Sequence, residues 1–75
     1  MRNQMLKLGE TIKKRRELLR LLQPDLSAIS GINRRTIQLV EQGKGNPSLD
    51  TLIRICSPLG LSIHLGLKEI DGITE

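Results

Sequence analysis

The segment from Gln23 to Gly43 constrains the fold of this chain more than any other, because one glycine divides it into two short helical patterns. Pro24 is tolerated in the first turn of a helix, where its missing N–H costs nothing. Gly31 supplies the left-handed conformation that ends this helix. Asn33 is a favoured N-cap for the next helix, which stops at Gly43. The segment therefore predicts two helices that meet at a tight corner.

The second helix of this segment has two unlike faces. Ile37, Val40 and Glu41 are predicted to lie on its buried side. The opposite side presents four polar residues: Arg34, Arg35, Gln38 and Gln42. Such a helix can keep its apolar back on a small core while its polar side faces outward, so it is suited to enter a DNA major groove.

Composition narrows the classes of protein to which the chain can belong. Its 75 residues allow one small domain, and its net charge of +4 favours a polyanionic partner. The absence of aromatic residues excludes folds that stack single-stranded bases on aromatic side chains. A single cysteine excludes an intrachain disulfide and a cysteine-rich zinc site.

Catalysis is not predicted from this sequence. Ser30 and Ser62 have no histidine and aspartate companions for nucleophilic chemistry, so we expect no enzyme, no cofactor and no metal site. No apolar run approaches the length of a membrane-spanning helix, and the N-terminus lacks a signal-peptide pattern. The expected compartment is a reducing cytoplasm.

A first helix is expected over residues 6–21, after a loose polar lead over residues 1–5. Arg16 shares a face with Ile12, so its guanidinium needs a carboxylate partner in the interior. Glu41 lies on the buried side of a later helix, and we predict that Arg16 and Glu41 form an ion pair. The remaining basic residues of the first helix are expected to face solvent: Lys13, Lys14 and Arg15.

A loop over residues 43–47 precedes a fourth predicted helix. Ser48 is its expected N-cap. Apolar residues then recur at helical spacing: Leu49, Leu52, Ile53, Cys56 and Leu59. Because Pro58 restricts the residue before it, this helix should end near Cys56, or tighten or kink around Pro58.

The pattern changes from helical to alternating over residues 61–68, which is typical of a strand. Its apolar positions are Leu61, Ile63, Leu65 and Leu67. An isolated strand leaves its backbone groups unpaired, so we expect this strand to pair with the same strand of a second subunit about a two-fold axis. Residues 69–75 are predicted to be a flexible tail.

In combination, these residues resemble the Cro/repressor (XRE) helix-turn-helix family over residues 8–61. The positions that carry the resemblance are Leu8-Gly9-Glu10-Thr11-Ile12, Arg16, Gln23, Leu26, Gly31-Ile32, Thr36-Ile37, Glu41, Gly43, Asn46-Pro47-Ser48-Leu49, Leu52 and Leu59-Gly60-Leu61. The alternating segment that follows is similar to that of small HipB-type antitoxin regulators, several of which end in a strand that joins two subunits.

The resemblance implies roles for individual residues. Base contacts are expected from the outer face of the recognition helix: Arg34, Arg35, Gln38 and Leu39. Contacts to the DNA backbone are expected from Gln23, Asn33, Thr36, Lys44 and Asn46. The resemblance also implies the buried ion pair between Arg16 and Glu41. A dimer interface is expected at the four apolar positions of the terminal strand.

Four positions depart from the family pattern. Leu22 stands where a threonine or serine N-cap is usual, and Arg20 stands where a glycine usually follows the first helix. Ser27 replaces a common alanine at the contact between helices, and Pro58 is unusual near the end of the fourth helix. These departures bring three predicted features into question: the turn after the first helix, the N-cap of the second helix and the end of the fourth helix.

We therefore predict an all-α, lambda-repressor-like helix-turn-helix domain of four to five helices over residues 6–60, with a C-terminal β-strand over 61–68 for dimer pairing. The expected function is a sequence-specific transcriptional repressor that binds a palindromic DNA operator as a homodimer. One alternative is a HipB-like antitoxin that represses its own operon and binds a HipA-like toxin. Another alternative is a protein-interaction module that has lost DNA binding.

Overall fold

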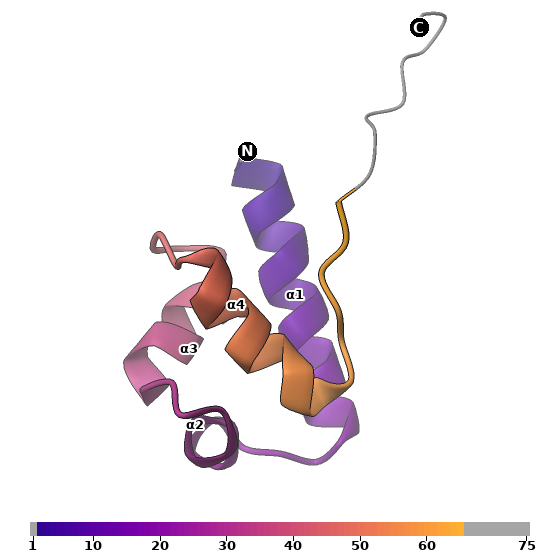
Figure 1. The fold of residues 1–75 in the computed structure, drawn as a ribbon, viewed down its shortest axis with the longest axis vertical. Helices are drawn as coiled ribbons and strands as arrows, with labels where there is room; N and C mark the ends of the chain where they lie inside the picture. Colours follow the sequence, from indigo (N-terminus) through magenta and orange to yellow (C-terminus); the bar gives the residue numbers. More distant parts are fainter. Residues whose placement is uncertain (1, 66–75) are drawn as a thin grey trace, which may run out of the picture.

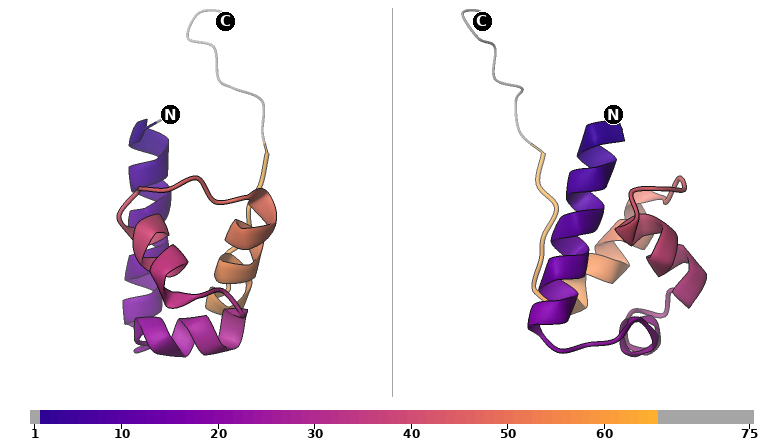
Figure 2. Two further views of the ribbon diagram at one scale, coloured as in Figure 1. Left: turned by 90° about the vertical axis from the view of Figure 1, so that its left-hand side faces the viewer. Right: turned by 180° about the vertical axis from the view of Figure 1, so that it is seen from behind.

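The computed structural model of the chain describes residues 2–65, which form four α-helices and one 3₁₀ turn. The elements are α1 (Arg2–Leu18), α2 (Gln23–Ser30), α3 (Arg34–Glu41), α4 (Leu49–Cys56) and η1 (Ser57–Leu59). Helix α1 is the longest, and α3 and α4 lie to one side of it (Figure 1). Helix α2 runs across the end of the domain, below α3 and α4 (Figure 2). The all-α helix-turn-helix architecture predicted from the sequence is confirmed.

Helix α1 differs from its prediction at both ends. It begins at Arg2, so the expectation of a loose lead is wrong for residues 2–5, which continue the helix without a proline or glycine to interrupt it. It ends at Leu18 rather than near Leu21, because Arg20 adopts a left-handed conformation with φ of 59°.

Two backbone hydrogen bonds close this turn after α1. The N–H of Arg20 donates to the carbonyl of Glu17 at 2.9 Å, and the N–H of Leu21 donates to the carbonyl of Arg16 at 3.0 Å. This pair of bonds is the Schellman ending, which favours glycine at the left-handed residue. Arg20 therefore performs the turn that a glycine would normally make.

The helix ends that follow agree with the sequence patterns. Helix α2 starts at Gln23, and Gly31 ends it with φ of 75°. Ser48 caps α4 by accepting a hydrogen bond from the N–H of Thr51 at 3.1 Å. At the far end, α4 stops at Cys56 and the chain tightens into η1 around Pro58. Two of the alternatives expected of this proline, an end near Cys56 and a tightening of the chain, therefore occur together.

The core is formed by apolar side chains from all five elements. Its buried members are Ile12, Leu26, Ile37, Val40, Ile55, Cys56 and Leu59. Leu49 and Ile53, which recur at helical spacing in the sequence, are instead exposed, and so are Leu19 and Ile29. With helices of only eight residues, a core of this size covers one narrow stripe of each helix, and neighbouring apolar positions remain outside.

No strand is formed within residues 2–65. Residues 61–65, the described part of the predicted strand, turn back toward the end of the molecule where α1 begins (Figure 1). Leu61 and Ile63 are half-buried against the core, whereas Leu65 is 99% exposed. Leu67 and the predicted tail over residues 69–75 lie outside the described residues.

Candidate nucleic-acid interface

The corner between α2 and α3 is fixed by local hydrogen bonds. The N–H of Gly31 donates to the carbonyl of Ser27 at 3.0 Å, and the N–H of Ile32 donates to Oγ of Ser30 at 3.1 Å. Asn33 then caps α3, since its Oδ1 accepts from the N–H of Thr36 at 2.8 Å. The short polar side chains in this corner therefore bind their own backbone and set the direction of α3.

Helix α3 turns one face to the core and the other to solvent. Ile37 and Val40 are at most 1% exposed. On the outer face Arg34 and Arg35 are exposed and Gln38 is half-exposed. Three of the four side chains predicted to reach bases, those of Arg34, Arg35 and Gln38, are therefore presented outward rather than covered by the domain itself.

A buried ion pair between Arg16 and Glu41 holds the back of α3 against α1. Nε of Arg16 lies 2.7 Å from Oε2 of Glu41, and Nη2 donates to Oε1 at 3.0 Å, so the contact is bidentate. The two side chains are only 9% and 3% exposed. Hydrogen bonding to Glu41 raises the pKa of the Arg16 guanidinium further above its usual value, against the opposing effect of burial. The pair predicted from the spacing of the sequence is thus present.

The same network extends to both ends of the turn between α1 and α2. Nη1 of Arg16 donates to the carbonyl of Leu21 at 2.8 Å. Nε2 of Gln23, the first residue of α2, donates to Oε1 of Glu41 at 3.1 Å. Three helices are therefore joined through one carboxylate, and the side chain of Gln23, which the family resemblance assigns to the DNA backbone, also supports α3 from within.

The start of α2 has a different cap from the one the family pattern offers. Leu22 provides no side-chain cap. Instead Asp25, three residues on, accepts from the N–H of Leu22 at 2.8 Å through Oδ2. The departure at Leu22 is therefore compensated in part by a carboxylate in the first turn, where it also favours the helix dipole.

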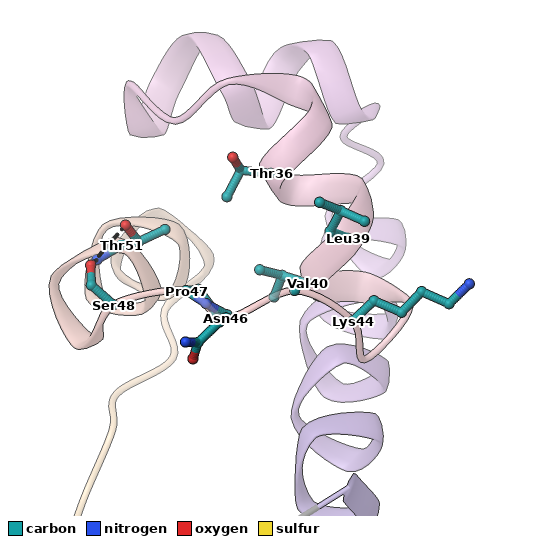
Figure 3. A pocket seen from close by; sticks show the side chains of 9 residues that line it. Thr36, Leu39, Val40, Lys44, Asn46, Pro47, Ser48 and Thr51 are labelled. Carbon is teal, nitrogen blue, oxygen red and sulfur yellow. Dashed lines mark hydrogen bonds between the residues drawn. The ribbon is translucent and has the colours of Figure 1, made fainter.

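A shallow hollow of about 280 Å³ lies between α3, the loop that follows it and the start of α4 (Figure 3). Four of the residues predicted to contact DNA line it: Thr36, Leu39, Lys44 and Asn46. The side chain of Lys44 points away from the hollow into solvent, while Ser48 and Thr51 are hydrogen-bonded to each other on the α4 side (Figure 3).

The loop beside this hollow is tied to the end of α3. The N–H of Lys44 donates to the carbonyl of Leu39 at 2.8 Å, and the N–H of Gly43 donates to that of Val40 at 3.0 Å. A β-carbon built on Gly45 would lie 3.4 Å from Cβ of Leu39, so the loop rests on this side chain. Leu39 thus packs against the loop that carries Lys44 and Asn46, a role that the sequence pattern did not indicate.

One basic residue of α1 differs from its prediction. Arg15 was expected to face solvent with Lys13 and Lys14, but it is half-buried and its Nε donates to the carbonyl of Leu59 at 2.7 Å. The partner is a backbone atom 44 residues away, and nothing in the local pattern marks it. Lys13 and Lys14 are exposed, as expected.

The described residues also bear on two other possibilities, a metal site and a membrane-spanning helix. Within residues 2–65, no group of three or more side chains is arranged to hold a metal ion. None of the helices described there is both long and apolar enough to cross a membrane.

Comparison with known proteins places this arrangement in a family. A family model described as helix-turn-helix matches residues 12–65. The chain is 34% identical over 50 residues to a Haemophilus influenzae protein named as an HTH-type transcriptional regulator, covering 67% of this chain and 51% of that protein. It is 32% identical over 63 residues to a Methanococcus maripaludis protein named as an HTH-type transcriptional regulatory protein, covering 84% of this chain and 19% of that one.

The chain therefore spans about half of the Haemophilus relative and about a fifth of the Methanococcus relative. The region matched by the family model includes both α2 and α3. The match of the family model over more than half of the sequence, together with the geometry of α2 and α3, shows that this chain belongs to the Cro/repressor (XRE) type of helix-turn-helix family, whose members are DNA-binding transcription regulators.

Proposed function

We propose that this chain is a sequence-specific transcriptional repressor that binds a palindromic DNA operator as a homodimer. The observation that carries the proposal is the exposure of Arg34 and Arg35 in the first turn of α3, a helix whose opposite face is buried in the core. A helix that enters the major groove presents its N-terminal residues to base edges. Arginine in this position binds O6 and N7 of guanine through two hydrogen bonds, or a neighbouring phosphate.

The residues that line the hollow beside α3 are placed to contact the DNA backbone next to the bases that α3 would contact. Lys44 extends from its rim into solvent, and Asn46 lies in the same loop. The positive charge of Lys44 attracts phosphate, and displaced counterions make that attraction dependent on salt. Base contacts from α3 and backbone contacts from the loop would then fix one register of the domain on DNA.

Dimerisation is supported by the residues that follow η1. Leu65 is 99% exposed, while Leu61 and Ile63 of the same segment are half-buried on the core. A second copy of the segment would cover Leu65 and pair with the backbone of residues 62–65, which makes no backbone hydrogen bond within residues 2–65. Two α3 helices would then enter successive major grooves roughly 34 Å apart on the operator. Repression would follow if the bound dimer excludes RNA polymerase from the operator, and this step is inferred from the family resemblance.

Selection of bound sites from random DNA duplexes tests this function directly. The purified chain should enrich a palindromic sequence, and its affinity for that sequence should fall steeply with salt. The double variant Arg34→Ala with Arg35→Ala should lose the enrichment. The matched control is Lys13→Ala with Lys14→Ala, which removes the same charge from the exposed side of α1 and should keep the selected sequence.

The alternatives give different outcomes in the same experiment. Absence of binding even at low salt would contradict the proposal and favour an interaction module. A HipB-like antitoxin would bind the operator in the same way and would in addition bind a HipA-like toxin. The antitoxin alternative is supported only by the resemblance of the terminal segment to HipB-type regulators, so the repressor is the function we propose.

A further inference from the structure

Arg15 connects the first helix to the point where the C-terminal segment leaves the domain. Its Nε donates to the carbonyl of Leu59 at 2.7 Å. The side chain is half-buried, whereas those of Lys13 and Lys14 before it are exposed. Arg15 is therefore held in one place, unlike the solvated lysines beside it.

The carbonyl that Arg15 binds is left open by the way η1 ends. The N–H of Gly60 donates to the carbonyl of Ser57 at 3.1 Å, and the N–H of Leu61 donates to that of Cys56 at 3.0 Å. Both of these bonds use carbonyls that precede Leu59, so the carbonyl of Leu59 requires a donor from elsewhere. Arg15 supplies this donor from α1.

The guanidinium also lies beside Gly60, the exposed residue at which the chain changes direction. Gly60 is left-handed, with φ of 74°, and a β-carbon built on it would lie 3.3 Å from Nη2 of Arg15. Arg15 and Leu61 border the same hollow on the surface of α1. The turn that starts the C-terminal segment is thus held by its own backbone hydrogen bonds and by one arginine side chain.

We propose that Arg15 is a positioning residue for dimerisation, because it sets the direction in which residues 61–65 leave the DNA-binding domain. This inference rests on the homodimer of the proposed function. If residues 61–65 pair with a second copy, their direction determines how well the two segments align and how far apart the two α3 helices are held. A planar guanidinium fixes the direction of its N–H groups, which the flexible ammonium of a lysine does not.

The experiment compares Arg15→Ala and Arg15→Lys with the wild-type chain and with Lys14→Ala as the matched control. Lys14→Ala removes a neighbouring positive charge that borders the same hollow but has no bond to Leu59. Three quantities are measured: the dimer dissociation constant by sedimentation, the order of the backbone amides of residues 61–65 by ¹⁵N relaxation, and affinity for DNA carrying one or two half-sites. Circular dichroism establishes that each variant is folded at the temperature used.

The proposal expects Arg15→Ala to disorder the amides of residues 61–65 and to weaken dimerisation about tenfold, because a segment that is no longer held in the monomer must be ordered when it pairs. Affinity for two half-sites should fall while affinity for a single half-site stays unchanged. Arg15→Lys should resemble Arg15→Ala, and Lys14→Ala should resemble the wild type. Should Arg15→Ala prevent folding, Arg15→Lys alone makes the comparison, because it retains the charge and the aliphatic stem.

The outcomes separate the two proposals. A wild-type dimer whose dissociation constant is unchanged in folded Arg15→Ala or Arg15→Lys overturns the role of Arg15 and leaves the dimeric repressor standing. Equal losses at one and two half-sites would also overturn it, since they indicate a general loss of structure. A wild-type chain that stays monomeric at high concentration and on DNA overturns the homodimer, and with it the role of Arg15.

Discussion

The backbone of α1 at Gly9 lies directly against the backbone of α3 at Val40. A β-carbon built on Gly9 would overlap the carbonyl oxygen of Val40 and would come within 2.9 Å of that of Glu41. Gly9 is buried in the middle of a helix, where glycine is otherwise unfavourable relative to alanine. The cost of glycine in this helix is offset, because the missing β-carbon lets α1 and α3 approach closely enough for the Arg16–Glu41 pair to form.

Gly9→Ala should therefore destabilise the domain, by at least about 2 kcal/mol, because backbone atoms of α3 would have to move. Urea denaturation followed by circular dichroism measures the change in the free energy of unfolding. Gly31→Ala provides the comparison: no atom beyond the two neighbouring residues would lie within 4 Å of its β-carbon, so only its left-handed backbone is penalised, by about 1–2 kcal/mol. A Gly9→Ala variant as stable as the wild type would show that the close approach has no energetic importance.

Arg16→Met should cost about 3–5 kcal/mol, because it leaves the carboxylate of Glu41 buried without its cation. The double variant Arg16→Met with Glu41→Leu should recover much of this loss, since no charge then remains in the interior. Thermal unfolding of the two single variants and the double variant forms a double-mutant cycle that measures the coupling. Additive effects in this cycle would contradict an energetic link between the two residues.

Arg20→Gly is expected to stabilise the chain, by up to about 1 kcal/mol. The left-handed conformation of Arg20 costs about 1–2 kcal/mol for a residue with a β-carbon, and the greater entropy of an unfolded glycine cancels only part of the gain. Arg20→Ala retains the β-carbon and should not stabilise, which separates backbone strain from loss of charge. A lower melting temperature for Arg20→Gly than for Arg20→Ala would disprove this account.

Lys44 and Arg35 should affect DNA binding in different ways under the proposed function. Lys44→Ala should weaken binding to all sequences alike and reduce the salt slope by about 1, because one phosphate contact is lost. Arg35→Ala should relax discrimination at one base pair, by about 1–3 kcal/mol if it reads guanine. Titration of the selected operator and its single-base variants at several salt concentrations distinguishes the two patterns, and identical behaviour of both variants would argue against the assigned roles.

Cys56 makes the stability of the fold sensitive to alkaline pH. Burial raises the pKa of the Cys56 thiol above its value in the unfolded chain. The contribution of the buried thiol to the free energy of unfolding is therefore fully present below the pKa of the thiol in the unfolded chain. It is lost as the pH rises through the higher pKa of the thiol in the folded chain. The wild-type chain should lose stability more steeply with rising alkaline pH than Cys56→Ala, as measured by urea denaturation across that range. Parallel pH profiles of the two proteins would contradict this expectation.

The features that the sequence could predict are those encoded within a few residues. Asn33 and Ser48 cap the helices they precede, and Gly31 ends α2, because each acts on backbone groups two to four positions away. Helical spacing also placed Arg16 and Glu41 on inward faces. Two charges that both point inward in a core this small have few other partners, so a long-range contact followed from local periodicity.

The features that the sequence could not predict depend on how the elements meet. The bond from Arg15 to Leu59 joins a side chain to a backbone carbonyl, which every residue possesses and no pattern identifies. The need for glycine at position 9 arises only when α3 lies across it. Ile29 and Ile53 have the spacing of core residues but are 57% and 48% exposed, because the neighbouring helices are too short to cover them.

The carboxylate of Glu41 binds side chains from α1 and α2 at once, through Arg16 and Gln23. A change at any of these three positions during evolution would disturb the other two, so the trio is expected to vary as a unit. Arg34 and Arg35 make no side-chain hydrogen bond or ion pair with other residues in the described range 2–65, and can be exchanged one at a time. If these two arginines read bases as proposed, a lineage descended from this chain could acquire a new target sequence through single substitutions without passing through an unfolded ancestor.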